Sequence, residues 1–231
     1  MSPDRRSHKL TKASDAFYRL KADITNGHFS CGEKLPMEGL KEKYEVGIGP
    51  LREALSRLTA QGLVNFEEQC GFTIPSLSLS DFNDLYLLRT EIDAIAIKLA
   101  IERGDIAWES EVVAHWHRFY TYSNPSNTSK IKLEIWESLQ RNFLFSLVKG
   151  CQSSLVVNIW NMLYDHASRY RALCFQYTLH QKAWLKKYYL EKEKLMKAML
   201  ERDTQKAITL SHKNWKSVMH KIQNILTKKG K

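Results

Sequence analysis

Proline and glycine are concentrated at one end of this 231-residue chain, and this feature constrains its fold more than any other. Four of the five prolines and seven of the ten glycines lie within residues 1–75. Because these residues interrupt helices and favour turns, the pattern indicates a domain of short elements followed by a domain of long helices. The segment 75–80, PSLSLS, is the expected linker. We therefore predict a mainly α chain with domains at residues 1–76 and 77–231.

Three short helices are expected in the N-terminal domain. Residues 12–25 and 37–44 have apolar side chains at helical spacing. A third helix is predicted to begin at Pro50, because the first helical turn needs no amide donor, and to stop at Gly62. Its apolar stripe consists of Leu51, Ala54, Leu55 and Leu58.

A β-hairpin is expected to follow these helices. Residues 63–67 and 72–75 have β-type composition, with Gln69, Cys70 and Gly71 turning between them. Three helices followed by a hairpin is the order of a winged helix-turn-helix. In such a domain the third helix lies in the major groove of DNA.

The rest of the chain predicts an all-α helical bundle. Its first helix is expected to be capped by Ser80 and Asp81, and Asp203 is expected to start the last helix. The six predicted helices lie near residues 80–103, 106–123, 128–149, 152–179, 182–202 and 204–227.

The net charge of +10 suggests a polyanionic partner. The position of the positive charges in the sequence does not support DNA binding by the N-terminal domain. The whole excess lies in residues 181–231, and the predicted DNA-binding domain is nearly neutral. A basic tail of this kind is more often a solvated helix face than a binding surface. The interpretation as a DNA reader therefore depends on the order of elements and not on charge.

Several other classes of protein lack support in the sequence. No apolar run approaches the ~20 residues of a membrane span, and the N-terminus has no signal core; we expect a cytoplasmic protein with no membrane partner. The four cysteines are scattered without a CxxC pair, which argues against a zinc finger. The histidines form no catalytic pattern, and no GxSxG, HExxH, P-loop or GxGxxG motif occurs. We therefore expect no enzymatic activity.

Residues 24–74 resemble the GntR family of transcriptional regulators. The resemblance is carried by NGHFSCGEKL, VGIGPLREALSRL and QGLV, followed by a wing turn at Gly71, and the middle motif is closer to the CsiR-like branch than to the usual pattern. Residues 81–91, DFNDLYLLRTE, resemble the first helix of the FCD ligand-binding domain, which indicates the FadR-type subgroup. The resemblance implies a homodimer that binds a palindromic double-stranded DNA operator, usually as a repressor, under the control of a small metabolite.

The resemblance also implies DNA contacts. Arg52 matches an arginine that enters the major groove, where a guanidinium can bond guanine with two hydrogen bonds. The alternative for Arg52 is a surface salt bridge with Glu53 or Glu45. Ile48 stands where the family usually has a second arginine, and Glu38 where other members present another. The further candidates are phosphate contacts or solvated surface charges at Lys34, Lys41, Lys43 and Arg57, and close backbone approach at Gly49 and Gly71.

Many FCD domains bind a divalent metal, but this sequence does not keep the ligands. Alignment places the four ligand positions at Gln140, Leu144, Lys192 and Asn214, none of which is a standard ligand there. We therefore expect no cofactor.

Lys192 could instead attract a small carboxylate directly, with Gln140 and Asn214 as hydrogen-bonding groups. Arg89 and Arg171 are expected to point inward as well, and Tyr170 to form part of the pocket wall. The alternative is a degenerate pocket in which Lys192 lies on the surface and Leu144 fills the space.

Two functions from different classes remain open at this point. The first is an effector-responsive DNA-binding regulator. The second is a helical ligand-binding or scaffold protein whose DNA-binding domain has drifted, an alternative motivated by Gly47, Ile48 and Gly49 at the start of the DNA-reading helix.

Overall fold

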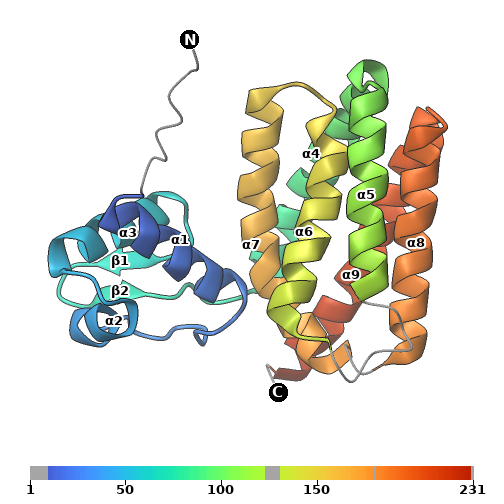
Figure 1. Cartoon of the computed structure of the whole chain (residues 1–231). Helices are drawn as coiled ribbons and strands as arrows, with labels where there is room; N and C mark the ends of the chain where they lie inside the picture. The colour runs from blue at the N-terminus through green and yellow to red at the C-terminus, as the bar shows by residue number, and fades with distance from the viewer. Residues whose placement is uncertain (1–9, 123–130, 179–180, 230–231) are drawn as a thin grey trace, which may run out of the picture. The chain divides into compact units, whose positions relative to one another are not determined.

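The chain folds into two compact units that divide between Ser76 and Leu77, within the expected linker. The computed structural model describes residues 10–122, 131–178 and 181–229. Figure 1 shows the first unit as short helices with a small two-stranded sheet and the second as long helices only. The mainly α fold class predicted from the sequence is confirmed.

The first unit contains the three predicted helices, α1 (Lys12–Thr25), α2 (Met37–Tyr44) and α3 (Ile48–Ala60). Both α1 and α2 pack on α3. The predicted stripe of α3 lies in the core, where Leu51, Leu55 and Leu58 are completely buried beside Leu20. Burial of this apolar face gives each short helix most of its stability.

The start of α3 differs from the prediction. The helix begins at Ile48, with Gly47 as the N-cap residue, so that Pro50 is its third residue. Proline is tolerated throughout the first turn, because amides there have no partner within the helix. Proline therefore marks the first turn without identifying the first residue.

The wing consists of two antiparallel strands, β1 (Asn65–Glu67) and β2 (Gly71–Thr73). They are shorter than predicted. Phe66 lies opposite Phe72, with ring centroids 4.9 Å apart. Gly71 begins the second strand with φ +81°, a conformation that glycine adopts without strain. Lys34 adds a bridge to Thr73, which ties the segment before α2 to the wing.

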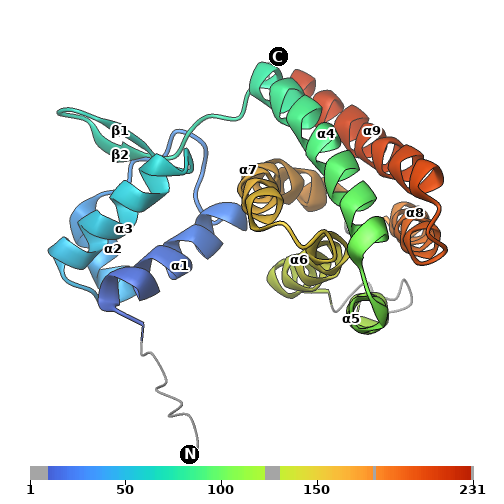
Figure 2. The ribbon, with the colours of Figure 1, turned by 90° about the horizontal axis from the view of Figure 1, so that it is seen from above.

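The second unit contains the predicted helical bundle, formed by long helices that run side by side (Figure 2). In it, α4 packs against α7 and α9, α5 against α6, and α8 against α9. Among the described residues, no helix is both long enough and apolar enough to cross a membrane. Residues 123, 128–130 and 179, which the prediction included in helices, lie outside the described residues. The helix bounds are α4 Leu79–Arg103, α5 Ile106–Tyr122, α6 Leu133–Lys149, α7 Ser154–Thr178, α8 Lys182–Leu200 and α9 Thr204–Lys229.

The N-cap of α4 is Ser78, and the prediction of Ser80 and Asp81 was wrong. The hydroxyl of Ser78 accepts a hydrogen bond from the amide of Asp81 at 3.0 Å. In a run of alternating serines, each hydroxyl is chemically able to cap, so the sequence alone does not select one. The prediction for α9 is confirmed, because Asp203 Oδ1 accepts from the amide of Lys206 at 3.0 Å.

Trp108 shows how tightly the bundle core is packed. Its indole lies against Gly104 and Gly150, and its Nε1 donates a hydrogen bond to the carbonyl of Ser146 at 2.8 Å. A Cβ at residue 150 would lie 2.6 Å from Trp108 Nε1. The two glycines therefore provide the space that the indole occupies.

We expect Gly150→Ala to lower the free energy of unfolding by about 1–3 kcal/mol, since the added methyl group displaces the buried indole. Urea unfolding followed by circular dichroism measures this change. The matched control is Gly39→Ala, where the nearest atom to the new Cβ lies 3.6 Å away and alanine is the better helix former. A Gly150→Ala protein as stable as the wild type would contradict the packing described.

Candidate functional site

Three of the predicted DNA-contacting residues lie around one groove of the N-terminal unit. The groove has a volume of about 650 Å³ and lies between α3 and the wing. Arg52 and Ser56 come from α3, Lys34 from the segment before α2, and Gly71 from the wing. An exposed cation on the third helix, next to a wing, is the arrangement with which such units approach DNA.

Arg52 is exposed on α3. Within the described part of the chain it forms no ion pair with Glu53 or Glu45, so the salt bridge considered as its alternative does not form there. Its guanidinium is available to an external acceptor. The role in base recognition stays a prediction.

The other predicted DNA-contacting residues do not line the groove. Gly49 is exposed, and a Cβ there would have no neighbour within 4 Å. Lys41 pairs with Glu38 at 3.0 Å, and Lys43 pairs with Asp23 at 2.8 Å.

Arg57 is turned toward the core of its own unit. Its guanidinium lies 4.1 Å from the ring centroid of Phe17, and it donates to Ser14 Oγ at 3.5 Å. These contacts join α3 to α1. In this position Arg57 supports the packing of the two helices. The sequence predicted Arg57 as a phosphate contact and did not predict this structural role.

A cavity of about 50 Å³ lies inside the helical unit. All four positions aligned with the family's metal ligands, Gln140, Leu144, Lys192 and Asn214, line it. The remaining predicted lining residues, apart from Tyr170, are also present, namely Arg89 and Arg171. The cavity exceeds the ~10–15 Å³ that one water molecule needs, so it can hold a small molecule.

Tyr170 does not line this cavity, and its prediction as the pocket wall was wrong. Its ring packs 4.8 Å from Phe82, and its hydroxyl donates to the carbonyl of Ser78 at 3.2 Å. The tyrosine of the same helix that does line the cavity is Tyr164. The two residues are six positions apart, about 240° around a helix, and so face different sides.

Arg89 is held by an acidic partner that sequence reasoning missed. Its Nε donates to Asp93 Oδ1 at 3.1 Å, and its NH1 donates to the carbonyl of Trp160 at 3.2 Å. Asp93 also accepts from Trp160 Nε1 at 2.9 Å and from Trp215 Nε1 at 2.7 Å. Burial lowers the pKa of Arg89, and the charge of Asp93 opposes this. The i, i+4 spacing of Arg89 and Asp93 was the available signal.

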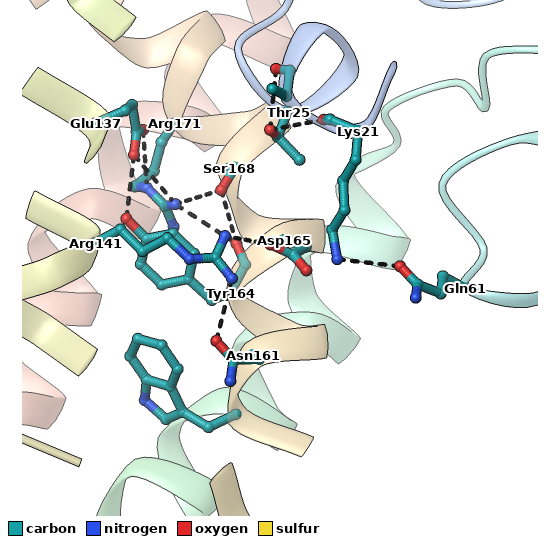
Figure 3. Close-up of polar contacts among 12 residues, drawn as sticks. Lys21, Thr25, Gln61, Glu137, Arg141, Asn161, Tyr164, Asp165, Ser168 and Arg171 are labelled. Carbon is teal, nitrogen blue, oxygen red and sulfur yellow. Dashed lines mark hydrogen bonds and ion pairs between the residues drawn. The ribbon is translucent and has the colours of Figure 1, made fainter. Parts of the chain in front are cut away.

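Arg171 has a second buried partner, Glu137 on α6 (Figure 3). Its Nε donates to Glu137 Oε1 at 3.2 Å, and its NH2 donates to Ser168 Oγ at 2.6 Å. Tyr164 Oη donates to Glu137 Oε2 at 3.1 Å. Burial acts to lower the pKa of Arg171, but the charge of Glu137 outweighs it and raises that pKa. No sequence spacing pointed to this pair, because 34 positions separate its members.

Lys192, on α8, is the cation of the cavity without a neutralising partner. Within the described part of the chain it forms no ion pair, and its Nζ lies 5.2 Å from the ring centroid of Tyr188. Burial lowers the pKa of Lys192 to about 8, although the charges of Asp93 and Glu191 act in the opposite direction. The partly buried ammonium therefore has no acidic side chain within ion-pair distance in the described part of the chain.

Two buried amides of the cavity also lack partners. Gln140 is 1% exposed and Asn214 is 4% exposed. Gln140 Oε1 and both polar atoms of the Asn214 amide have no hydrogen-bond partner among the residues that the structure describes. A buried polar group without a partner is costly, so these atoms indicate a place where a polar ligand or water binds.

The residues at the metal positions do not suit a cation. Leu144 has no ligand atom, and the ammonium of Lys192 repels positive charge. The described residues contain no group of three His, Cys, Asp or Glu side chains that could hold a metal ion. Of the four aligned positions, only Gln140 and Asn214 have an oxygen that could act as a ligand, and the ammonium at Lys192 favours an anion.

The fold and the groove define a class, that of DNA-binding transcription regulators with a winged helix and a helical domain around a cavity. The sequence matches the family described as "Bacterial regulatory proteins, gntR family" over residues 12–74 and the FCD domain over residues 84–215. The chain therefore belongs to the GntR family, with an FCD domain after the helix-turn-helix.

Known relatives agree with this assignment. The chain is 34% identical over 196 residues to the HTH-type transcriptional repressor GlaR of Escherichia coli, a match covering 85% of this chain and 89% of that protein. It is 36% identical over 158 residues to the HTH-type transcriptional regulator BphR of Paraburkholderia xenovorans, covering 68% and 64%. The structure of E. coli McbR/YncC is similar in fold, with a TM-score of 0.79 at 17% identity over 96% of this chain and all of that one. All three are described as regulators of transcription.

Proposed function

We propose that the protein is a repressor that binds a palindromic operator as a homodimer and that a small organic acid in the cavity controls this binding. The observation that carries the second part is the unneutralised Lys192 beside the unpartnered amides of Gln140 and Asn214. The name of the similar E. coli protein, a transcriptional repressor, supports the sign of the regulation. Such a protein acts in the cytoplasm, where the operator lies.

Titration of DNA from upstream of the protein's own gene tests the first part. Fluorescence anisotropy at two salt concentrations separates specific from non-specific binding, because phosphate contacts alone are strongly salt-dependent. We expect binding at least 10³-fold tighter than to scrambled DNA of the same length. Equal affinity for both would favour a helical ligand-binding protein with a drifted DNA-binding domain.

Release of the operator by acids tests the second part. A panel of short mono- and dicarboxylates is added to the protein–operator complex in the presence of EDTA. At least one acid is expected to shift the equilibrium, and chelation is expected to have no effect on it. A requirement for added metal would contradict the proposal.

We expect the affinity for the acid to depend on pH through Lys192. Burial lowers its pKa to about 8, so the ammonium is present below pH 8 and is lost as the pH rises through that value. Affinity for the acid should then be constant below pH 7 and fall by up to about tenfold per pH unit above 8. Calorimetric titration from pH 6.5 to 9.5 measures this profile.

The charged and titratable groups that face Lys192 support the assignment of the fall in affinity above pH 8 to Lys192. Arg89 is paired with Asp93 and Arg171 with Glu137. Burial raises the pKa of Tyr164 and of Tyr188, so both stay neutral in this range. Glu191, on the same helix as Lys192, lies near Lys187, with 3.9 Å between Nζ and Oε1. The control is Lys192→Met, for which we expect a flat profile; a fall above pH 8 in that variant would contradict the role of Lys192.

A further inference from the structure

The charges around the cavity leave a single positive charge for a ligand. Arg89 forms a buried ion pair with Asp93, and Arg171 forms one with Glu137. Each arginine is thereby neutralised within the protein. Lys192 is the remaining cation among the described lining residues, and no acidic side chain lies within ion-pair distance of it in the described part of the chain. One carboxylate would neutralise it, and a second would be buried without a counter-charge, which is unfavourable.

The unpartnered amides of the cavity indicate that the ligand has a polar group besides its carboxylate. Both polar atoms of Asn214 lack partners among the described residues. In either orientation of the amide, a ligand must therefore provide one hydrogen-bond acceptor and one hydrogen-bond donor. A carboxylate held by Lys192 supplies the acceptor. Asn214 Oδ1 and Gln140 Oε1 then require a donor. A ligand ammonium is disfavoured beside Lys192. Of the neutral donors, a hydroxyl group is preferred to an N–H group because its oxygen can also accept a hydrogen bond from the Asn214 amide.

The position of Lys192 and Asn214 indicates where the carboxylate lies. Both line the main cavity and also a smaller one of about 10 Å³. The other charged residues that line the smaller cavity, Lys187 and Glu191, pair with each other at 3.9 Å. The main cavity also has apolar lining residues, among them Ile97, Leu195 and Met199. A volume of about 50 Å³ excludes long chains, so the apolar part fits a short alkyl segment.

We propose that the ligand is a short hydroxy acid with one carboxylate, held by Lys192 and Asn214 without a metal ion, whose hydroxyl donates to Gln140 or Asn214. The inference depends on the proposed function, in which the cavity binds an acid, and narrows the class of that acid. It predicts that the cavity prefers acids with one carboxylate to dicarboxylates, and acids with a hydroxyl group to acids without one.

Calorimetric titration of the full-length protein with matched probes tests the proposal. The probes, all in EDTA, are 2- and 3-hydroxybutyrate, butyrate without the hydroxyl, malate with a second carboxylate, and uncharged 2-hydroxybutyramide. We expect one of the hydroxybutyrates to bind at least tenfold more tightly than butyrate, malate and the amide, because a site with unpartnered polar groups rejects analogues that leave them unpaired. Emission from Trp160 and Trp215, which line the cavity, gives a second readout.

A change of charge in the cavity should change the preferred ligand. Glu137→Gln keeps the shape of the side chain but frees the charge of Arg171. We expect the ratio of malate to hydroxybutyrate affinity to rise about tenfold in this variant. Lys192→Met should reduce hydroxybutyrate binding at least tenfold, with its circular dichroism spectrum and thermal unfolding as proof that the variant is folded. If either variant fails to fold, the wild-type probe series still decides.

The outcomes separate this inference from the proposed function. If malate binds and releases the operator while both hydroxybutyrates do not, the inference is overturned and acid control of the operator stands. If hydroxybutyramide binds as tightly as the acids, the role of Lys192 is overturned. If no acid binds, the inference and the acid control in the proposed function both fall.

Discussion

Arg52→Ala is expected to reduce selection of the operator strongly while leaving the fold intact. Arg52 is exposed on α3 at the groove and, in the described part of the chain, forms no ion pair with Glu45 or Glu53. A guanidinium that bonds a guanine with two hydrogen bonds contributes about 1–3 kcal/mol of discrimination. In a dimer the loss occurs in both half-sites, so we expect specific affinity to fall on the order of 10²-fold. Affinity for scrambled DNA should change little.

The matched control is Arg57→Ala, on the same helix. The Arg57 guanidinium lies over the ring of Phe17 and faces α1, so its loss should lower stability rather than discrimination. Anisotropy titrations against operator and scrambled DNA, with thermal unfolding of each variant, separate the two effects. A ratio of specific to non-specific affinity that is unchanged in Arg52→Ala, or reduced equally in Arg57→Ala, would contradict the assignment.

Asp93→Ala is expected to have the largest effect on stability, about 3–5 kcal/mol. Asp93 neutralises Arg89, which is 2% exposed, and accepts from the indole groups of Trp160 and Trp215. Its removal leaves a buried guanidinium without a counter-charge, and the buried indole N–H of Trp160 and the partly buried one of Trp215 without this acceptor. A domain is stable by only about 5–15 kcal/mol, so this loss removes a large share.

Urea unfolding monitored by tryptophan emission measures this effect. Glu111→Ala is the matched control, since it breaks an ion pair with Lys149 that is about half exposed and 2.9 Å long. Pairs of that kind contribute about 0–1 kcal/mol. If Asp93→Ala and Glu111→Ala destabilise the protein equally, Asp93 does not have the structural role described.

The helices and the positions of most cavity residues could be predicted from the sequence. The apolar stripe of α3 fixed which of its faces is buried, and the alignment at Gln140 and Lys192 brought distant residues to one cavity. Both results depend on local periodicity and on the family resemblance. Neither requires knowledge of which side chains meet across helices.

The partners of the two arginines could not be predicted in the same way. The sequence predicted that Arg89 and Arg171 point inward but not that Asp93 and Glu137 neutralise them. The choice between Tyr164 and Tyr170 failed for a related reason, since helix α7 is buried over several faces and periodicity does not say which face meets the cavity. Pairing between helices is a tertiary property, and a single sequence shows it only where the members lie one turn apart.

The cap of α4 at Ser78 has a consequence for regulation. From Leu79, the residue after this cap, to Arg89 is about 15 Å of continuous helix. Tyr170, the neighbour of Arg171, donates to the carbonyl of Ser78. Both helices that carry the cavity arginines therefore meet two residues from the point where the chain leaves the helical unit. Linkage through such a junction is reciprocal: an acid that weakens operator binding by a given factor is itself bound more weakly, by that same factor, when the operator is present. The amount of operator in the cell would then help set the concentration of acid to which the protein responds.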